Sequence, residues 1–223
     1  MGLLKGGTVM TMQKATYSEV RNRVLAGDVI AFLGDNPVSK VIDWMGKSGV
    51  SHVGIIVEEG TAGQEPRFAE SSVHVDDKKL QYTVEVSSFR LSVEAYKGAV
   101  WWLPMAVAAR QDFHKGTFDK FIGRATGQPF DPSQGLQVVL RDLVQKHIRM
   151  HPAVEVEPHI QKGYCCSVLV ARALTAAAVV TIGDPEKASP GDVCSWSIYA
   201  PDYYLLKGDA ELRIYNSLPP GQA

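Results

Sequence analysis

The amino-acid sequence predicts an α+β fold in which helices pack on a small antiparallel sheet. Several short segments rich in β-branched and aromatic residues follow one another with only local turns between them, which is typical of antiparallel strands. Other segments carry apolar residues at helical spacing. The 223 residues contain no linker or low-complexity segment. We therefore expect a single domain over 1–223, in which the mainly helical 104–160 region is an elaboration.

The N-terminal half supplies most of the expected strands. After a loose arm over 1–14, Thr16 and Glu19 have the spacing of a capping box and predict a short helix. A second helix is expected over 38–45, because Asn36 and the proline after it form a good helix start. Apolar runs of strand length, bounded by turn residues, predict strands over 29–33, 51–57, 67–72, 80–86 and 100–103.

The C-terminal half is expected to contain more helix. Apolar stripes predict helices over 113–126 and 136–150. Ser189-Pro190-Gly191-Asp192 is predicted to be a turn, because these residue types favour turns. Two further apolar segments, 203–206 and 212–215, are expected to complete the sheet.

Two adjacent cysteines, Cys165 and Cys166, precede a segment over 167–174 that has helical apolar spacing. A thiol at such a loop-to-helix junction lies near unpaired backbone N–H groups and the positive end of the helix dipole. That field favours the thiolate, which is the nucleophilic form. The alternative interpretation is two small apolar residues buried at a helix start. Neighbouring side chains on a helix point about 100° apart, so only one of the two can face a given partner.

His52 opens the expected strand over 51–57, and Glu70 lies in the next strand beside apolar neighbours. If these strands pair as a hairpin, the two side chains can share a face. A carboxylate hydrogen-bonded to an imidazole fixes its tautomer and stabilises the imidazolium, as a cysteine–histidine pair requires. Each residue taken alone is more simply interpreted as a solvated strand residue.

A metal site is the alternative from a different functional class. His147 and His151 are spaced i, i+4 and could face the same way on a helix. No third ligand is evident, Pro152 interrupts the helix, and the adjacent cysteines lack the spacing of a zinc knuckle. The sequence therefore predicts no metal.

Composition excludes several other classes of protein. A net charge of −1 gives no electrostatic case for binding nucleic acid or an anionic membrane. The longest apolar-rich run, 99–109, is too short to span a bilayer, and the N-terminus has no secretory signal pattern. Three cysteines, two of them adjacent, make a poor disulfide framework. We therefore expect a chain without a transmembrane segment in a reducing compartment, the cytoplasm.

Four motifs in a fixed order carry a resemblance to a known family. They are Gly-Asp-Val-Ile-Ala-Phe at 27–32, Ser-His-Val-Gly-Ile-Ile-Val at 51–57, Ala-Glu-Ser at 69–71 and Tyr-Cys-Cys-Ser-Val-Leu-Val at 164–170. This order resembles the permuted branch of the NlpC/P60 papain-like superfamily. The bacterial YiiX/YebB-like proteins belong to that branch, and the lecithin:retinol acyltransferase-like proteins are related to it. The resemblance implies a circularly permuted papain-like α+β fold, with a small antiparallel sheet packed on the cysteine-bearing helix.

The resemblance also implies roles for individual residues. It implies that Cys166 is the catalytic nucleophile, that His52 is the base and that Glu70 is the third member of the triad. Tyr164 and Ser51 are weaker candidates for contact with the oxyanion or the substrate. Cys165 stays open as an alternative nucleophile, because only the serine that follows Cys166 sets the register of the motif.

The function implied by the resemblance is that of a cysteine hydrolase. It would cleave an amide bond of peptide or amino-acyl type through an acyl-enzyme, without a cofactor. An acyltransferase, thioesterase or lipid esterase on the same triad and a non-catalytic binding module of the same fold are the alternatives. Trp101 and Trp102 could line a lipid-accepting groove, although they are better interpreted as core residues. The expected partner is a small peptide, amino-acyl or acyl-lipid substrate.

Overall fold

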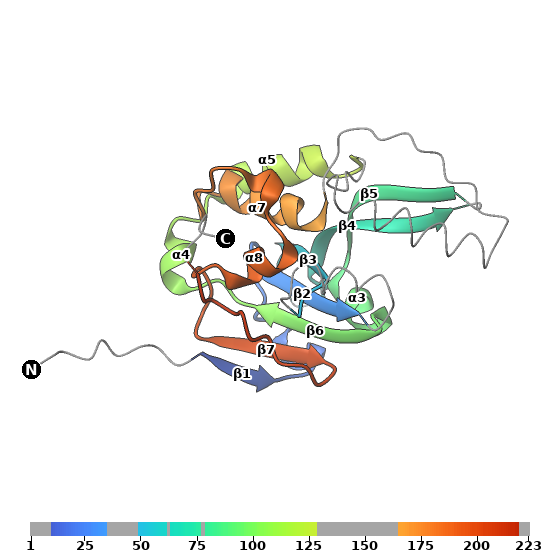
Figure 1. Ribbon diagram of the computed structural model, residues 1–223. Coiled ribbons are helices and arrows are strands. Elements are labelled where there is room, and N and C mark those ends of the chain that lie inside the picture. Colours follow the sequence, from blue (N-terminus) through green and yellow to red (C-terminus); the bar gives the residue numbers. More distant parts are fainter. Residues whose placement is uncertain (1–9, 35–48, 62, 77–78, 129–164, 219–223) are drawn as a thin grey trace, which may run out of the picture.

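The chain folds into a mixed α+β structure built on one seven-stranded sheet (Figure 1). A computed structural model describes residues 10–34, 49–61, 63–76, 79–128 and 165–218. The strands are β1 (Thr11–Lys14), β2 (Val29–Gly34), β3 (His52–Glu58), β4 (Arg67–Asp76), β5 (Lys79–Ser88), β6 (Gly98–Leu103) and β7 (Asp202–Lys207). Their order across the sheet is β1-β7-β6-β2-β3-β4-β5, and every pairing is antiparallel except that of β1 with β7.

Helices cover both faces of this sheet. Those described are α1 (Tyr17–Val20), α3 (Phe89–Ala95), α4 (Val107–Gln111), α5 (Lys115–Ala125), α7 (Cys166–Ala176) and α8 (Pro190–Ser195), with a short 3₁₀ helix, η1, over Pro185–Lys187. In Figure 1, α5 and α7 lie together above β3, and the hairpin of β4 and β5 extends away from the centre of the sheet. None of the helices within the described part of the chain is long and apolar enough to cross a membrane.

The core divides into two main clusters because successive side chains of a strand point to opposite faces. On β2, Val29 and Ala31 pack into a first cluster with residues of α5, α7 and α8. Ile30 and Phe32 pack into a second cluster with residues of α1 and α3. Burying both faces makes β2 and its neighbours a rigid centre for the fold.

A buried carboxylate ties this centre together. Asp28 is 1% exposed and stands directly before β2. It accepts hydrogen bonds from the indole N–H of Trp102, the backbone N–H groups of Leu25 and Met105, and the guanidinium of Arg110. Burial raises the pKa of Asp28, while the Arg110 charge and the N–H donors oppose that rise. One side chain thereby joins the turn before β2 to β6 and α4.

Most of the strands predicted from local pattern are confirmed. The segments 29–33, 51–57, 67–72, 80–86, 100–103 and 203–206 coincide with β2, β3, β4, β5, β6 and β7. The predicted helix over 113–126 is α5. The capping box is also confirmed, since Glu19 Oε2 accepts a hydrogen bond of 2.6 Å from the Thr16 N–H at the start of α1.

Two expectations at the ends of the sheet are wrong. The arm over 1–14 was expected to be loose, but its residues Thr11–Lys14 form β1. The N–H of Thr11 donates to Pro201 and that of Ala15 to Leu205, which fixes β1 in parallel beside β7. The segment 212–215 forms no strand, although Leu212 and Tyr215 are buried against the core.

Two helix starts were also misread. The expected turn over 189–192 is the beginning of α8, because Ser189 accepts from the Asp192 N–H and Asp192 accepts from the Ser189 N–H. This reciprocal capping box uses turn-forming residues to begin a helix. The helix α3 was not predicted at all, and the Ser88 hydroxyl accepts from the Leu91 N–H at its start.

Several expectations fall on residues that lie outside the described ranges. They are the helices over 38–45 and 136–150 and most of the 104–160 elaboration, of which α4 and α5 are the described helices. The single-domain organisation over 1–223 stays a prediction.

We expect Asp28→Ala to lower the free energy of unfolding by about 3 kcal/mol, because it leaves the Arg110 charge without its carboxylate partner and the buried N–H donors without an acceptor. Urea denaturation followed by circular dichroism measures this loss. Asp119→Ala is the matched control, since Asp119 forms an exposed ion pair with Lys115 at 2.7 Å, and should change stability by less than about 1 kcal/mol. Equal effects of the two substitutions would contradict the assignment of Asp28 as a hub.

Candidate active site

Three polar side chains from three different elements meet beside the N-terminus of α7. His52 is the first residue of β3, Glu70 lies on β4, and Cys166 is the first residue of α7. The Nε2 atom of His52 lies 2.7 Å from Oε2 of Glu70, and the imidazole also hydrogen-bonds the Cys166 sulfur. Because Nε2 is engaged by Glu70, Nδ1 is the ring nitrogen left for the sulfur.

Strand alternation places His52 and Glu70 on the same face of the sheet. Ile56 of β3 pairs with Phe68 of β4, and both side chains lie in the second core cluster. His52 is four residues from Ile56, and Glu70 is two residues from Phe68, so both polar side chains point to that face. The His52 ring also packs on Phe32, with 5.4 Å between ring centroids. The imidazole is therefore held by a hydrogen bond to a carboxylate and by a tilted contact with an aromatic ring.

Cys166 reaches His52 at the place where β3 and β4 separate. Ile56 of β3 pairs with Phe68 of β4, and Ile55 pairs with Ala69. The pairing of the two strands ends there. α7 packs against both strands at this point. The Val53 N–H, which a continued ladder would direct at β4, donates to the Cys166 sulfur instead. Because β3 and β4 diverge, the N-terminus of α7 can approach His52. The same divergence leaves the Val53 N–H available to the first side chain of the helix, Cys166.

The electrostatics of the site favour a charged pair. Burial alone would raise the pKa of the Cys166 thiol, but the His52 charge and hydrogen bond outweigh burial and hold that pKa below its usual range. Burial opposes protonation of His52, yet Cys166 and Glu70 raise its pKa well above the ordinary value. Both pKa shifts therefore favour a thiolate next to an imidazolium, which is the charge state that thiol nucleophiles require.

The other cysteine of the doublet has the opposite character. Cys165 is the N-cap residue of α7 and is 7% exposed. Burial and the neighbouring Cys166 charge raise the pKa of Cys165 to about 11. The structure thus brings Cys166, and not Cys165, to the histidine, and of the two thiols only Cys166 has a lowered pKa.

The weaker candidates are placed differently. Ser51 is buried, and its hydroxyl donates to the Phe32 carbonyl and accepts from the Gly34 N–H, each at 3.2 Å, so both bonds serve the β2 backbone. Tyr164 and the histidines His147 and His151 lie outside the described ranges. Trp101 and Trp102 are buried in the core. Across the described residues, no three or more potential ligands are grouped so that they could hold a metal ion.

Sequence reasoning did not identify the support around His52. Gly54 faces the Phe68 ring so closely that a Cβ there would lie 2.1 Å from Phe68 Cε2 and 2.8 Å from the Ala69 carbonyl oxygen. Phe68 in turn contacts Phe32, at 5.8 Å between ring centroids. The glycine two residues after the histidine was the visible signal, since an isolated glycine in a strand often marks such a close approach.

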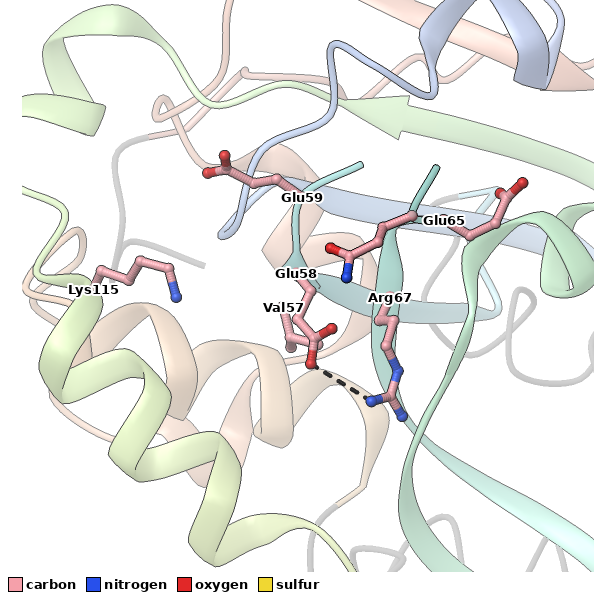
Figure 2. A pocket seen from close by; sticks show the side chains of 7 residues that line it. Val57, Glu58, Glu59, Glu65, Arg67 and Lys115 are labelled. Carbon is pink, nitrogen blue, oxygen red and sulfur yellow. Dashed lines mark ion pairs between the residues drawn. The ribbon is translucent and has the colours of Figure 1, made fainter. Parts of the chain in front are cut away.

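A separate cavity lies at the opposite end of β3. It has a volume of about 430 Å³, and Val57, Glu58, Arg67 and Lys115 are among its lining residues (Figure 2). Glu58 and Arg67 form an exposed ion pair of 3.5 Å across it. The cavity shares no residue with the cysteine–histidine–carboxylate site and plays no part in its geometry.

Comparison with known proteins gives a distant likeness among solved structures. No protein-family model matches the sequence, and no curated protein matches it. The crystal structure of the metalloprotein YiiX from Escherichia coli O157:H7 is similar with a TM-score of 0.43 and 17% sequence identity, over 71% of this chain and 69% of that one. A YiiX-like neighbour thus exists among solved structures, but at this distance the likeness identifies neither a family nor an activity.

We expect Gly54→Ala to lower the free energy of unfolding by about 1–3 kcal/mol, because the new methyl group must displace the Phe68 ring or the strand beside it. Gly123→Ala on α5 is the matched control. A Cβ at Gly123 meets nothing within 4 Å, and alanine is the better helix former, so stability should stay equal or rise by up to about 1 kcal/mol. Urea denaturation of both variants distinguishes overpacking at Gly54 from a general effect of replacing glycine.

Proposed function

We propose that this protein is a cysteine hydrolase that cleaves an amide bond of peptide or amino-acyl type through an acyl-enzyme on Cys166. The observation that carries the proposal is the meeting of Cys166 and His52, with Glu70 hydrogen-bonded to the ring, in surroundings that lower the pKa of the thiol and raise that of the imidazole. The chain order of histidine, carboxylate and cysteine, with the cysteine helix packed on an antiparallel sheet, supports a permuted papain-like fold for it.

The proposed mechanism follows from the charges. The Cys166 thiolate attacks the substrate carbonyl, and N–H groups at the start of α7 stabilise the oxyanion that forms. His52 then gives its proton to the departing amine, which leaves a neutral imidazole and a thioester on Cys166. His52 next takes a proton from water, the hydroxide attacks the thioester, and the acid and the thiolate are released. Glu70 holds the ring and stabilises its protonated form throughout.

The protonation state of His52 favours amide substrates over esters. An amine is a poor leaving group until it is protonated, whereas an alkoxide or thiolate leaves more readily. A histidine whose pKa is raised well above the ordinary value starts the reaction with that proton in place. Acyl transfer and the cleavage of thioesters or lipid esters use the same residues, and the substrate experiment below includes them as outcomes.

The proposal needs a reduced thiol. Cys165, Cys166 and Cys194 are all free cysteines, and the sequence led us to expect a reducing, cytoplasmic environment. Such a compartment would keep Cys166 available as the thiolate.

We expect iodoacetamide to label Cys166 rapidly at pH values well below the ordinary thiol pKa of about 8.5, because the lowered pKa of Cys166 keeps it ionised there. In His52→Ala, the labelling rate at Cys166 should fall at neutral pH and rise only as the pH approaches that ordinary value or exceeds it. Peptide mass spectrometry at each pH measures the rate at each cysteine separately.

His114→Ala is the control for this experiment, since His114 is an exposed histidine at the start of α5. It should leave the labelling profile of Cys166 unchanged. Slow labelling of Cys166 in the wild type, with no dependence on His52, would reject the catalytic proposal and favour a binding module of the same fold.

We expect a panel of amino-acyl and peptidyl amides, esters and thioesters to produce a mass increase on Cys166 that corresponds to the acyl group. Amides should turn over with a bell-shaped pH profile, because the reaction needs both the thiolate and the imidazolium. Cys166→Ala should abolish turnover and the adduct, whereas Cys194→Ala, which removes another buried thiol, should preserve both. Turnover of esters or thioesters alone would replace the amidase proposal by an esterase or acyltransferase.

A further inference from the structure

Of the two adjacent thiols, Cys166 interacts with His52, whereas Cys165 contacts a buried serine. Ser167 follows the doublet and is 3% exposed. Its hydroxyl donates to the carbonyl oxygen of Ala188 at 2.5 Å. The Oγ atom of Ser167 also lies 3.5 Å from the Cys165 sulfur. Ser167 is therefore placed between Cys165 and a carbonyl group of the chain before α8.

The direction of these two hydrogen bonds follows from counting protons. A hydroxyl group carries one proton, and a carbonyl oxygen can only accept. The Ser167 proton must therefore go to Ala188, so the contact with Cys165 is made by the thiol S–H donating to Oγ. A thiolate at Cys165 would face an oxygen lone pair with no proton between them. With its proton directed at Ala188, the Ser167 hydroxyl therefore stabilises the neutral form of Cys165.

We propose that Ser167 is a positioning residue that selects Cys166 as the nucleophile, by holding Cys165 as a neutral thiol that donates to the serine oxygen. The inference rests on the proposed function, since it concerns which sulfur performs that chemistry. Burial of Cys165 and the charge of Cys166 act in the same direction and raise the pKa of the Cys165 thiol. The backbone N–H groups of Ser167 and Val168 oppose that rise, and so would a Ser167 hydroxyl that turned from Ala188 to donate to the sulfur. The bond to Ala188 also fixes the first turn of α7 against the residue that precedes the Ser189 cap of α8.

The first test is the distribution of label between the two cysteines. In wild-type protein, limited iodoacetamide treatment should modify Cys166 and spare Cys165. In Ser167→Ala, the share on Cys165 should rise by up to about tenfold, which is what the loss of one ordinary hydrogen bond allows. An unchanged distribution in Ser167→Ala would overturn the proposal.

Ser195→Ala is the matched control for the loss of a buried hydroxyl. Ser195 is 4% exposed, and its hydroxyl donates to the Asp192 carbonyl at 2.8 Å within α8. The substitution removes a comparable bond near the site without touching Cys165. The distribution of label should stay that of the wild type, and a shift equal to that of Ser167→Ala would attribute the effect to general loosening and overturn the proposal.

The second test does not require a reactive Cys166. In Cys166→Ala protein, the infrared S–H stretching band of Cys165, assigned by its loss in the Cys165→Ala/Cys166→Ala double variant, should lie at the lower wavenumber of a donating thiol. Adding Ser167→Ala should move it to higher wavenumber. A Cys165 band already at the position of a non-donating thiol overturns the proposal, even where the Ser167 variant fails to fold. Because this measurement is independent of catalysis, it separates failure of this inference from failure of the proposed hydrolase.

Discussion

The separation of β4 from β3 beyond Ile55 and Ala69 is the constraint on which the candidate site depends. Continued pairing would consume the Val53 N–H in the ladder and close the sheet between the two faces. Because the strands part, the first residue of α7 can reach from the face that its helix covers to a histidine on the other face. The divergence thereby joins groups that strand alternation would otherwise keep on opposite sides of the sheet.

The charged forms of Cys166, His52 and Glu70 stabilise one another, because the histidine interacts with both of the other groups. A single charge taken into the interior without a partner costs several kcal/mol. His52 interacts with both the sulfur of Cys166 and the carboxylate of Glu70, so in the charged form that the pKa shifts favour, each negative group has a positive neighbour. The histidine and glutamate side chains are still about a fifth exposed, at 20% and 21%. Water therefore shares the cost of the charges, and the pair can be charged without a fully buried ion network.

Local sequence patterns predicted the strands well, because the burial of a strand and the alternation of its side chains between two faces determine which residue types each segment contains. They missed β1 because its four residues are largely exposed and only pairing with β7, far along the chain, gives them an ordered form. They misread the start of α8 because the same residue types form turns and capping boxes. At the site, motif order indicated Cys166, His52 and Glu70, which the structure brings together. A backbone donor such as the Val53 N–H and a ring support such as Phe32 depend on tertiary pairing and leave no local signal.

The two ends of β2 connect the stability of the fold to the geometry of the site. Asp28 anchors the beginning of this strand, and the Phe32 ring near its end packs on the imidazole of His52. β2 pairs with β3 on one side and β6 on the other, so its backbone cannot tilt without breaking a ladder. The histidine therefore lies opposite a strand that is paired on both sides, and Glu70 lies on β4, which stays paired with β5 after it leaves β3. His52 is thus supported through its pairing with β2 and Glu70 through the β4–β5 ladder, so the hydrogen bond between the two side chains depends on two separate pairings of the sheet.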